Sequence, residues 1–100
     1  MKAAQSVIGK ALRWTRRARG MAQEEFDVVS SRTYISELER GVRQPTVQKV
    51  DMLAATMQIH PLTLLTLSYC RIPSTVESTA LLARVRDEIN DLVAANAGDQ

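Results

Sequence analysis

Apolar residues recur along most of this chain three or four positions apart, which is the spacing of an amphipathic α-helix. Strand signals are nearly absent, so we expect an all-α fold. The pattern predicts helices over about residues 5–19, 23–28 and 32–40, one after Thr46, one from His60-Pro61, and a long one from Ser74 to about Ala95.

One apolar face of each of the first five helices is expected to contribute to a common core. The core should be mainly aliphatic, because aromatic residues make up only 4% of the chain. The positions expected to face inward are Val7, Ile8, Ala11, Leu12, Phe26, Tyr34, Ile35, Leu38, Val47, Val50, Leu53, Ala54, Met57, Leu62, Leu65 and Tyr69.

The segment from Ser31 to Gly41 divides into two distinct faces. Tyr34, Ile35 and Leu38 share one arc, while Ser31 is a good N-cap and Gly41 a good stop. The opposite arc carries Arg32, Thr33, Ser36, Glu37 and Arg40. The DNA major groove admits one α-helix and is read by such side chains, so we expect this helix to enter it. The alternative is an ordinary solvated face.

The segment Arg71-Ile-Pro-Ser74 is expected to separate a first domain, residues 1–71, from a C-terminal helical segment, residues 72–100. Ser74 and Glu77 form a capping box for the long helix. Its apolar stripe consists of Leu81, Leu82, Val85, Ile89, Leu92 and Val93. The alternating three and four spacing of Leu82, Val85, Ile89 and Leu92 predicts a dimer interface. The alternative is that the stripe packs on its own domain.

Charge divides the chain at the same place. Residues 1–71 hold 11 Lys and Arg against 6 Asp and Glu, whereas residues 72–100 hold 2 against 5. A basic body with an acidic tail fits nucleic-acid binding in the first part and a different task in the second.

The sequence gives little support to catalytic or metal chemistry. The single Cys70 excludes an intramolecular disulfide, and with the single His60 it cannot supply a zinc site. No nucleophile–base set or glycine-rich phosphate loop occurs, so we expect no enzyme, cofactor or metal. No signal peptide and no apolar run near the ~18 residues of a membrane span is seen, which predicts a cytoplasmic protein without a membrane partner.

Three stretches together resemble the helix-turn-helix domain of the Cro and phage-repressor (Xre-type) regulators. These are Gln23-Glu-Glu-Phe26, Tyr34-Ile-Ser-Glu-Leu-Glu-Arg-Gly41, and Pro45-Thr46 before an amphipathic helix. The resemblance covers about residues 7–67 and implies five helices in the same order, followed here by the long C-terminal helix. In this motif the third helix enters the major groove, so the resemblance implies a sequence-specific regulator of double-stranded DNA.

The resemblance assigns base reading to Arg32, Thr33, Ser36 and Glu37. Arg32 could bind a guanine, Thr33 a thymine methyl group, and Glu37 a cytosine. A carboxylate near phosphates is repelled unless a base or an arginine compensates it, so Glu37 needs such a partner.

The resemblance also implies contacts that position the protein on the DNA backbone. Gln23 at the start of the second helix would bind a phosphate, as would Arg43 and Gln44 in the loop after the third helix. Thr46 could add a donor. Arg13, Arg17 and Arg19 stay open between a solvated face and diffuse attraction to phosphates.

Arg16 and Glu39 match positions that form a structural ion pair between the first and third helices in this family.

Three features depart from the family pattern. The link over residues 27–31 is two residues shorter than usual, and Thr15 replaces an apolar residue. Ala22 replaces a capping Ser or Thr, which loses about 1 kcal/mol.

We therefore expect a homodimeric repressor that reads a palindromic operator with helix 32–40. The alternative is an antitoxin-like protein whose C-terminal helix binds a partner protein, with or without DNA binding.

Overall fold

A computed structural model describes residues 7–97, and this part of the chain is entirely helical apart from its connections. The elements are α1 (Ile8–Ala18), the short 3₁₀ helix η1 (Gln23–Phe26), α2 (Arg32–Glu39), α3 (Val47–Thr56), α4 (Pro61–Tyr69) and α5 (Thr75–Asn96). The expected all-α fold, with five helical elements followed by a long C-terminal helix, is confirmed. The predicted start of the first helix near residue 5 lies outside the described residues.

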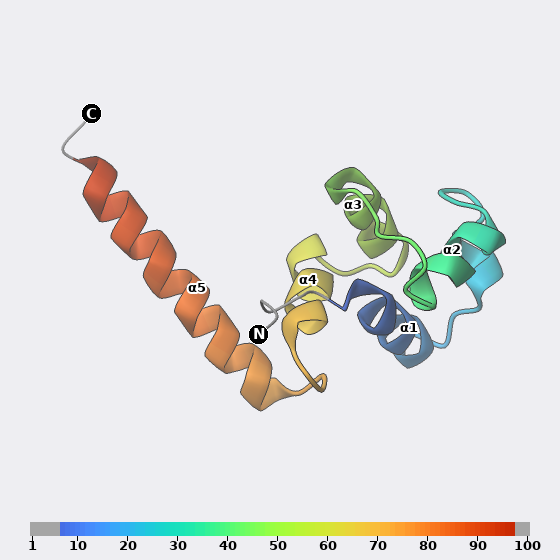
Figure 1. The fold of residues 1–100 in the computed structure, drawn as a ribbon, viewed down its shortest axis with the longest axis horizontal. Coiled ribbons are helices and arrows are strands. Elements are labelled where there is room, and N and C mark those ends of the chain that lie inside the picture. Colours follow the sequence, from blue (N-terminus) through green and yellow to red (C-terminus); the bar gives the residue numbers. More distant parts are fainter. Residues whose placement is uncertain (1–6, 98–100) are drawn as a thin grey trace.

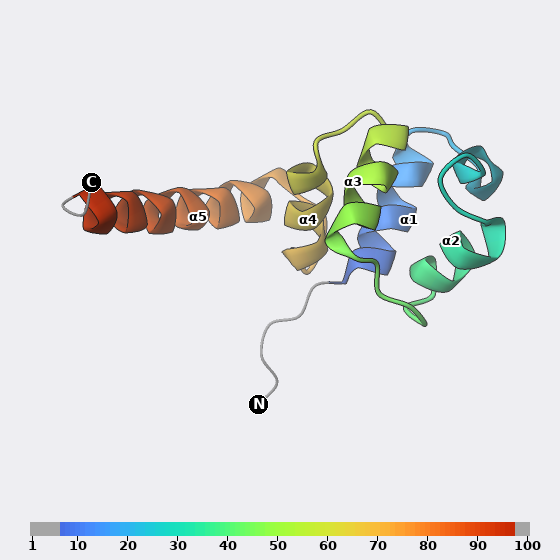
Figure 2. The ribbon, with the colours of Figure 1, turned by 90° about the horizontal axis from the view of Figure 1, so that it is seen from above.

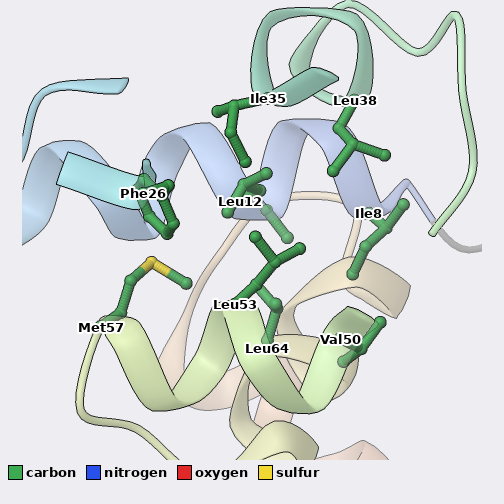
Figure 3. Packing of buried hydrophobic residues seen from close by; sticks show 10 residues of the cluster. Ile8, Leu12, Phe26, Ile35, Leu38, Val50, Leu53, Met57 and Leu64 are labelled. Carbon is green, nitrogen blue, oxygen red and sulfur yellow. The ribbon is translucent and has the colours of Figure 1, made fainter. Parts of the chain in front are cut away.

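The first five elements enclose one apolar core (Figure 3). Leu12, Leu53 and Leu64 come from α1, α3 and α4, lie near its centre and are at most 1% exposed. Ile35 and Leu38 cover one side of this centre from α2. The core therefore fixes the inner face of α2 against α1 and leaves its opposite face outside.

Four residues expected in the core are exposed instead. Val7 precedes α1 and Val47 is the first residue of α3, so neither has a preceding helical turn to cover; they are 43% and 77% exposed. Leu62 and Tyr69 on α4 are 60% and 54% exposed. The inward face of α4 is formed by Leu64 and Ser68.

The inward face of α4 was predicted wrongly for a simple reason. Four of its nine residues are leucines, and they point in several directions around the helix, so the spacing did not identify one inward face. Leu62 and Tyr69 instead line a groove between α4 and α5, together with Leu81, Leu82 and Val85. Leu65 packs against the core as expected and also borders this groove.

Helices α1, α2 and α3 end with the same hydrogen-bonding pattern. The N–H groups of Met21, Val42 and Ile59 each donate to the carbonyl five residues earlier, which is the Schellman pattern. The residue before each has a positive φ: Gly20 at 67°, Gly41 at 78° and Gln58 at 60°. Gly41 therefore ends α2 as predicted, and Gly20 ends α1 in the same way.

Gly9 allows α1 to cross α2 at very short range. A Cβ atom at position 9 would lie 2.1 Å from the carbonyl oxygen of Leu38, on the last turn of α2. Real Cβ atoms do not approach a backbone oxygen so closely, so only glycine fits this crossing. The position of α2 relative to α1 therefore depends on Gly9.

Helix α5 projects away from the other helices as a rod (Figures 1 and 2). It begins beside α4, where Ser74 Oγ accepts from the Glu77 N–H at 3.0 Å. The Glu77 carboxylate accepts from the Arg71 N–H rather than completing the predicted capping box. No residue of α5 is buried, and the radius of gyration is 15.6 Å, above the ~13 Å expected for a compact chain of this length.

Candidate nucleic-acid interface

The outward face of α2 carries the four residues expected to read bases. Ser31 caps the helix by accepting from the Tyr34 N–H at 3.1 Å, and Ile35 and Leu38 anchor the inner face. On the outer face Arg32 and Thr33 are exposed, and Ser36 and Glu37 are half-buried. The structure therefore brings these four side chains together on one accessible helix face.

Two of these four side chains have partners of opposite charge within the protein. Arg32 Nε lies 3.5 Å from a carboxylate oxygen of Glu24 on η1, and both side chains are more than half exposed. Glu37 Oε1 accepts a 2.8 Å hydrogen bond from Arg43 Nε. The exposed Arg32–Glu24 pair should contribute little free energy and can open when another partner arrives. Arg43 supplies the arginine that the Glu37 carboxylate was expected to need.

The Tyr34 ring links α2 to the following loop and to α3. The guanidinium of Arg43 lies 5.8 Å from the ring centroid and the ammonium of Lys49 lies 5.3 Å from it. Lys49 also donates to the Val29 carbonyl at 2.8 Å, in the turn before α2. The sequence analysis did not single out Lys49, which connects α3 to the turn before α2.

Arg16 and Glu39 lie in direct contact between α1 and the end of α2. Arg16 donates from Nε at 2.6 Å and from Nη2 at 2.9 Å to the two carboxylate oxygens of Glu39. Arg16 Nη1 donates to the Met21 carbonyl at 2.8 Å. The hydrogen bonds and negative charge of Glu39 raise the pKa of Arg16 above its usual value, against the opposing effect of burial. The guanidinium therefore remains charged in this contact.

The residues expected to hold phosphates differ in their surroundings. Gln23 donates its side-chain amide to Glu39 at 3.1 Å, so it extends the ion pair from η1. Gln44 is exposed, and Thr46 caps α3 by accepting from the Lys49 N–H at 3.1 Å. Arg43, Gln44 and Thr46 lie along the loop that joins α2 to α3.

The shortened link before α2 is accommodated by reducing the second helix to one 3₁₀ turn. The N–H groups of Val29 and Ser30 both donate to the Phe26 carbonyl, which closes the turn directly after η1. The side chain of Glu25 accepts from the Ala22 N–H at 2.7 Å, so this end of η1 is bonded despite the missing capping hydroxyl.

Arg19 has a structural role that the sequence left open. It donates from Nε to the Met57 carbonyl at 3.1 Å and from Nη2 to the Gln58 carbonyl at 3.5 Å. A cation at a helix C-terminus satisfies carbonyls that lack intrahelical partners. Arg19 thus ties the end of α1 to the end of α3.

Residues 7–97 contain no group of three or more His, Cys, Asp or Glu side chains able to hold a metal ion. No helix in this range is both long and apolar enough to cross a membrane.

A capped, outward-facing helix held on a small helical core defines a helix-turn-helix domain. The helix-turn-helix family model matches residues 12–64, more than half of the chain, from buried Leu12 on α1 to buried Leu64 on α4. The chain therefore belongs to the helix-turn-helix family of the Xre and phage-repressor type, and it is a DNA-binding transcription regulator of this kind. No curated protein and no solved structure matched the chain.

Proposed function

We propose that this protein is a homodimeric repressor that reads a palindromic operator with α2. The observation that carries the proposal is the outer face of α2, on which accessible polar side chains gather while the inner face is locked in the core. A rigid helix that presents such groups can meet base edges at a defined depth in the major groove.

The four outward residues of α2 have chemistries that suit different bases. Arg32 lies in the first turn and would donate to the O6 and N7 atoms of a guanine. Thr33 would contact a thymine methyl group, Glu37 would accept from a cytosine amino group, and Ser36 would bond to either kind of edge. Arg32 exchanges its exposed contact with Glu24 for the base at little cost, because that ion pair is open to solvent.

Phosphate contacts would flank this face and fix its register on the duplex. Arg43, Gln44 and Thr46 lie in the loop beyond α2, and Gln23 lies before it at the start of η1. We assign backbone contacts to these four residues, which position α2 without reading sequence. The Arg16–Glu39 ion pair would hold the end of α2 in the orientation that docking requires.

Helix α5 would supply the two-fold symmetry of the dimer. The side chains of Leu82, Val85, Ile89 and Leu92 are between 40% and 63% exposed, although they share one face of the helix. The apolar groove between α4 and α5 continues this stripe back to the domain. In this assignment residues 1–71 form the DNA-binding domain and residues 72–100 form the dimerisation element.

The same exposed stripe also supports a second candidate function. An antitoxin-like protein would place a partner protein on α5, because most of the stripe is left exposed in the described part of the chain. This version retains the helix-turn-helix domain and leaves DNA binding intact.

Selection of binding sites from a randomised duplex library, at near-physiological salt, tests the proposal. We expect enrichment of a palindrome whose half-sites are about one helical turn, ~10 bp, apart. A single enriched half-site would contradict the dimer, and failure to enrich any sequence would contradict base reading by α2. A 1:1 heterocomplex recovered when the chain is purified from its native cells would favour the partner-protein alternative.

A further inference from the structure

The loop after α2 turns back on the helix and brings Arg43 beside Glu37. The Val42 N–H donates to the Glu37 carbonyl at 2.9 Å, and the Gly41 N–H donates to the Leu38 carbonyl at 3.1 Å. This closed turn places Arg43 Nε 2.8 Å from Glu37 Oε1. The turn therefore keeps the backbone of residues 37 and 43 close together, so that their side chains can meet.

The Tyr34 ring provides a second support for Arg43. Tyr34 lies about one helical turn before Glu37, at the edge of the inner face, and its ring centroid is 5.8 Å from the guanidinium of Arg43. A guanidinium near an aromatic face is attracted by the ring quadrupole. Arg43 is thus held by a carboxylate and an aromatic ring at once.

The pair leaves hydrogen-bonding atoms available at the surface. Within residues 7–97, Glu37 Oε2 and the two terminal nitrogens of Arg43 have no hydrogen-bond partner. The Glu37 side chain is 25% exposed and the Arg43 side chain 57%. One carboxylate oxygen is therefore anchored, and the other can still accept a bond from outside.

Electrostatics decides what such a carboxylate can do beside DNA. An isolated carboxylate in the major groove is repelled by the phosphates and loses hydration when it reaches a base. A carboxylate already paired with an arginine enters as a neutral unit, and Oε2 can accept from the amino group of cytosine.

We propose that Arg43 is the positioning residue for Glu37, and that it gives the protein its preference for cytosine at the base pair Glu37 reads. This inference rests on the proposed DNA-reading function. Arg43 then has a second role besides the phosphate contact proposed above. Its Nε atom holds Glu37, while its terminal nitrogens remain available for the DNA backbone. Replacing Arg43 would then weaken the preference for cytosine as well as the overall affinity for DNA.

A positioning role for Arg43 and a phosphate contact alone predict different results in one binding experiment. The base pair read by Glu37 is located by comparing sites selected by the wild-type protein and by Glu37→Gln. Binding is then measured for four duplexes that differ only at that pair, using wild type, Arg43→Gln and the double variant. Two controls are matched: Arg40→Gln removes a nearby exposed charge, and Gln44→Ala removes the neighbouring proposed phosphate contact.

We expect the wild-type protein to bind the duplex with cytosine on the strand that Glu37 contacts about tenfold more tightly than each of the other three, including the duplex in which the same G·C pair is reversed. Arg43→Gln should bring the ratio of these affinities, cytosine duplex over the others, close to one. Adding Glu37→Gln should not lower this ratio further. Both control variants should keep the ratio, even where Gln44→Ala weakens binding to all four duplexes. Melting curves of the free variants should agree with wild type within a few degrees, because Arg43 lies outside the core.

Uniform weakening of all four duplexes by Arg43→Gln, with the cytosine ratio intact, would overturn the inference and leave the proposed function standing. A wild-type protein that selects no sequence would overturn both.

Discussion

Replacing Gly9 by alanine tests how α2 is positioned. The added Cβ would lie 2.1 Å from the Leu38 carbonyl oxygen, 3.1 Å from the Leu38 carbonyl carbon and 3.2 Å from the Glu39 oxygen. Ordinary contact begins at 3.4 Å, so α1 and α2 must separate by about 1.3 Å, the difference between 3.4 and 2.1 Å. All three atoms belong to the backbone, so no side chain can rotate away.

The net cost follows from two opposing effects. Forcing an extra methyl group into a packed contact costs up to ~3 kcal/mol, while alanine favours a helix over glycine by ~1 kcal/mol. We expect a loss of about 2 kcal/mol, which lowers the melting temperature by on the order of 10 °C in a domain of this size.

Thermal unfolding followed by circular dichroism measures this change, with Lys10→Ala as the control on the exposed side of the same helical turn. The sign of the shift is decisive. Helix propensity alone predicts that Gly9→Ala raises the melting temperature, so an increase would refute the close crossing. A decrease accompanied by weaker DNA binding would show that the crossing also positions α2 for binding.

Arg32→Ala should weaken binding to the selected site by ~1–3 kcal/mol and relax one base position, measured by fluorescence anisotropy; uniform weakening on all sequences would contradict base reading. Leu92→Asp should reduce the mass measured by light scattering to that of a monomer, whereas Ala94→Asp on the opposite side of α5 should not; an unchanged mass for Leu92→Asp would exclude dimerisation through the stripe. Thr15→Val should stabilise the domain by ~1 kcal/mol, because the buried Thr15 hydroxyl has no hydrogen-bond partner among the described residues; denaturant unfolding measures this, and a loss of stability would indicate a partner for the hydroxyl.

The sequence predicted α2 well because its information is local. One face is apolar, the opposite face is polar, Ser31 caps the start and Gly41 ends the helix, so every signal agrees. The inward face of helix α4, in contrast, was predicted wrongly. Its leucines point in several directions, and only packing against α1 and α3 selects Leu64 as the inward residue.

Contacts between distant residues were accessible only where the family pattern named them. Arg16 and Glu39 are 23 positions apart, and the resemblance alone paired them. No comparable pattern linked Arg19 to Met57, 38 positions away, so the role of Arg19 stayed open. Gly9 did carry a signal, because glycine inside a helix costs ~1 kcal/mol against alanine and so calls for a structural reason.

The short length of the stripe on α5 has a consequence for how a homodimer would respond to its own abundance. Leu82, Val85, Ile89 and Leu92 span only about two heptads, which gives an interface of limited area. Monomers and dimers would then exchange at low protein levels. Because only dimers fill both half-sites, operator occupancy would rise with the square of the monomer concentration. Repression would therefore begin over a narrow range of protein levels, sharper than single-site binding allows.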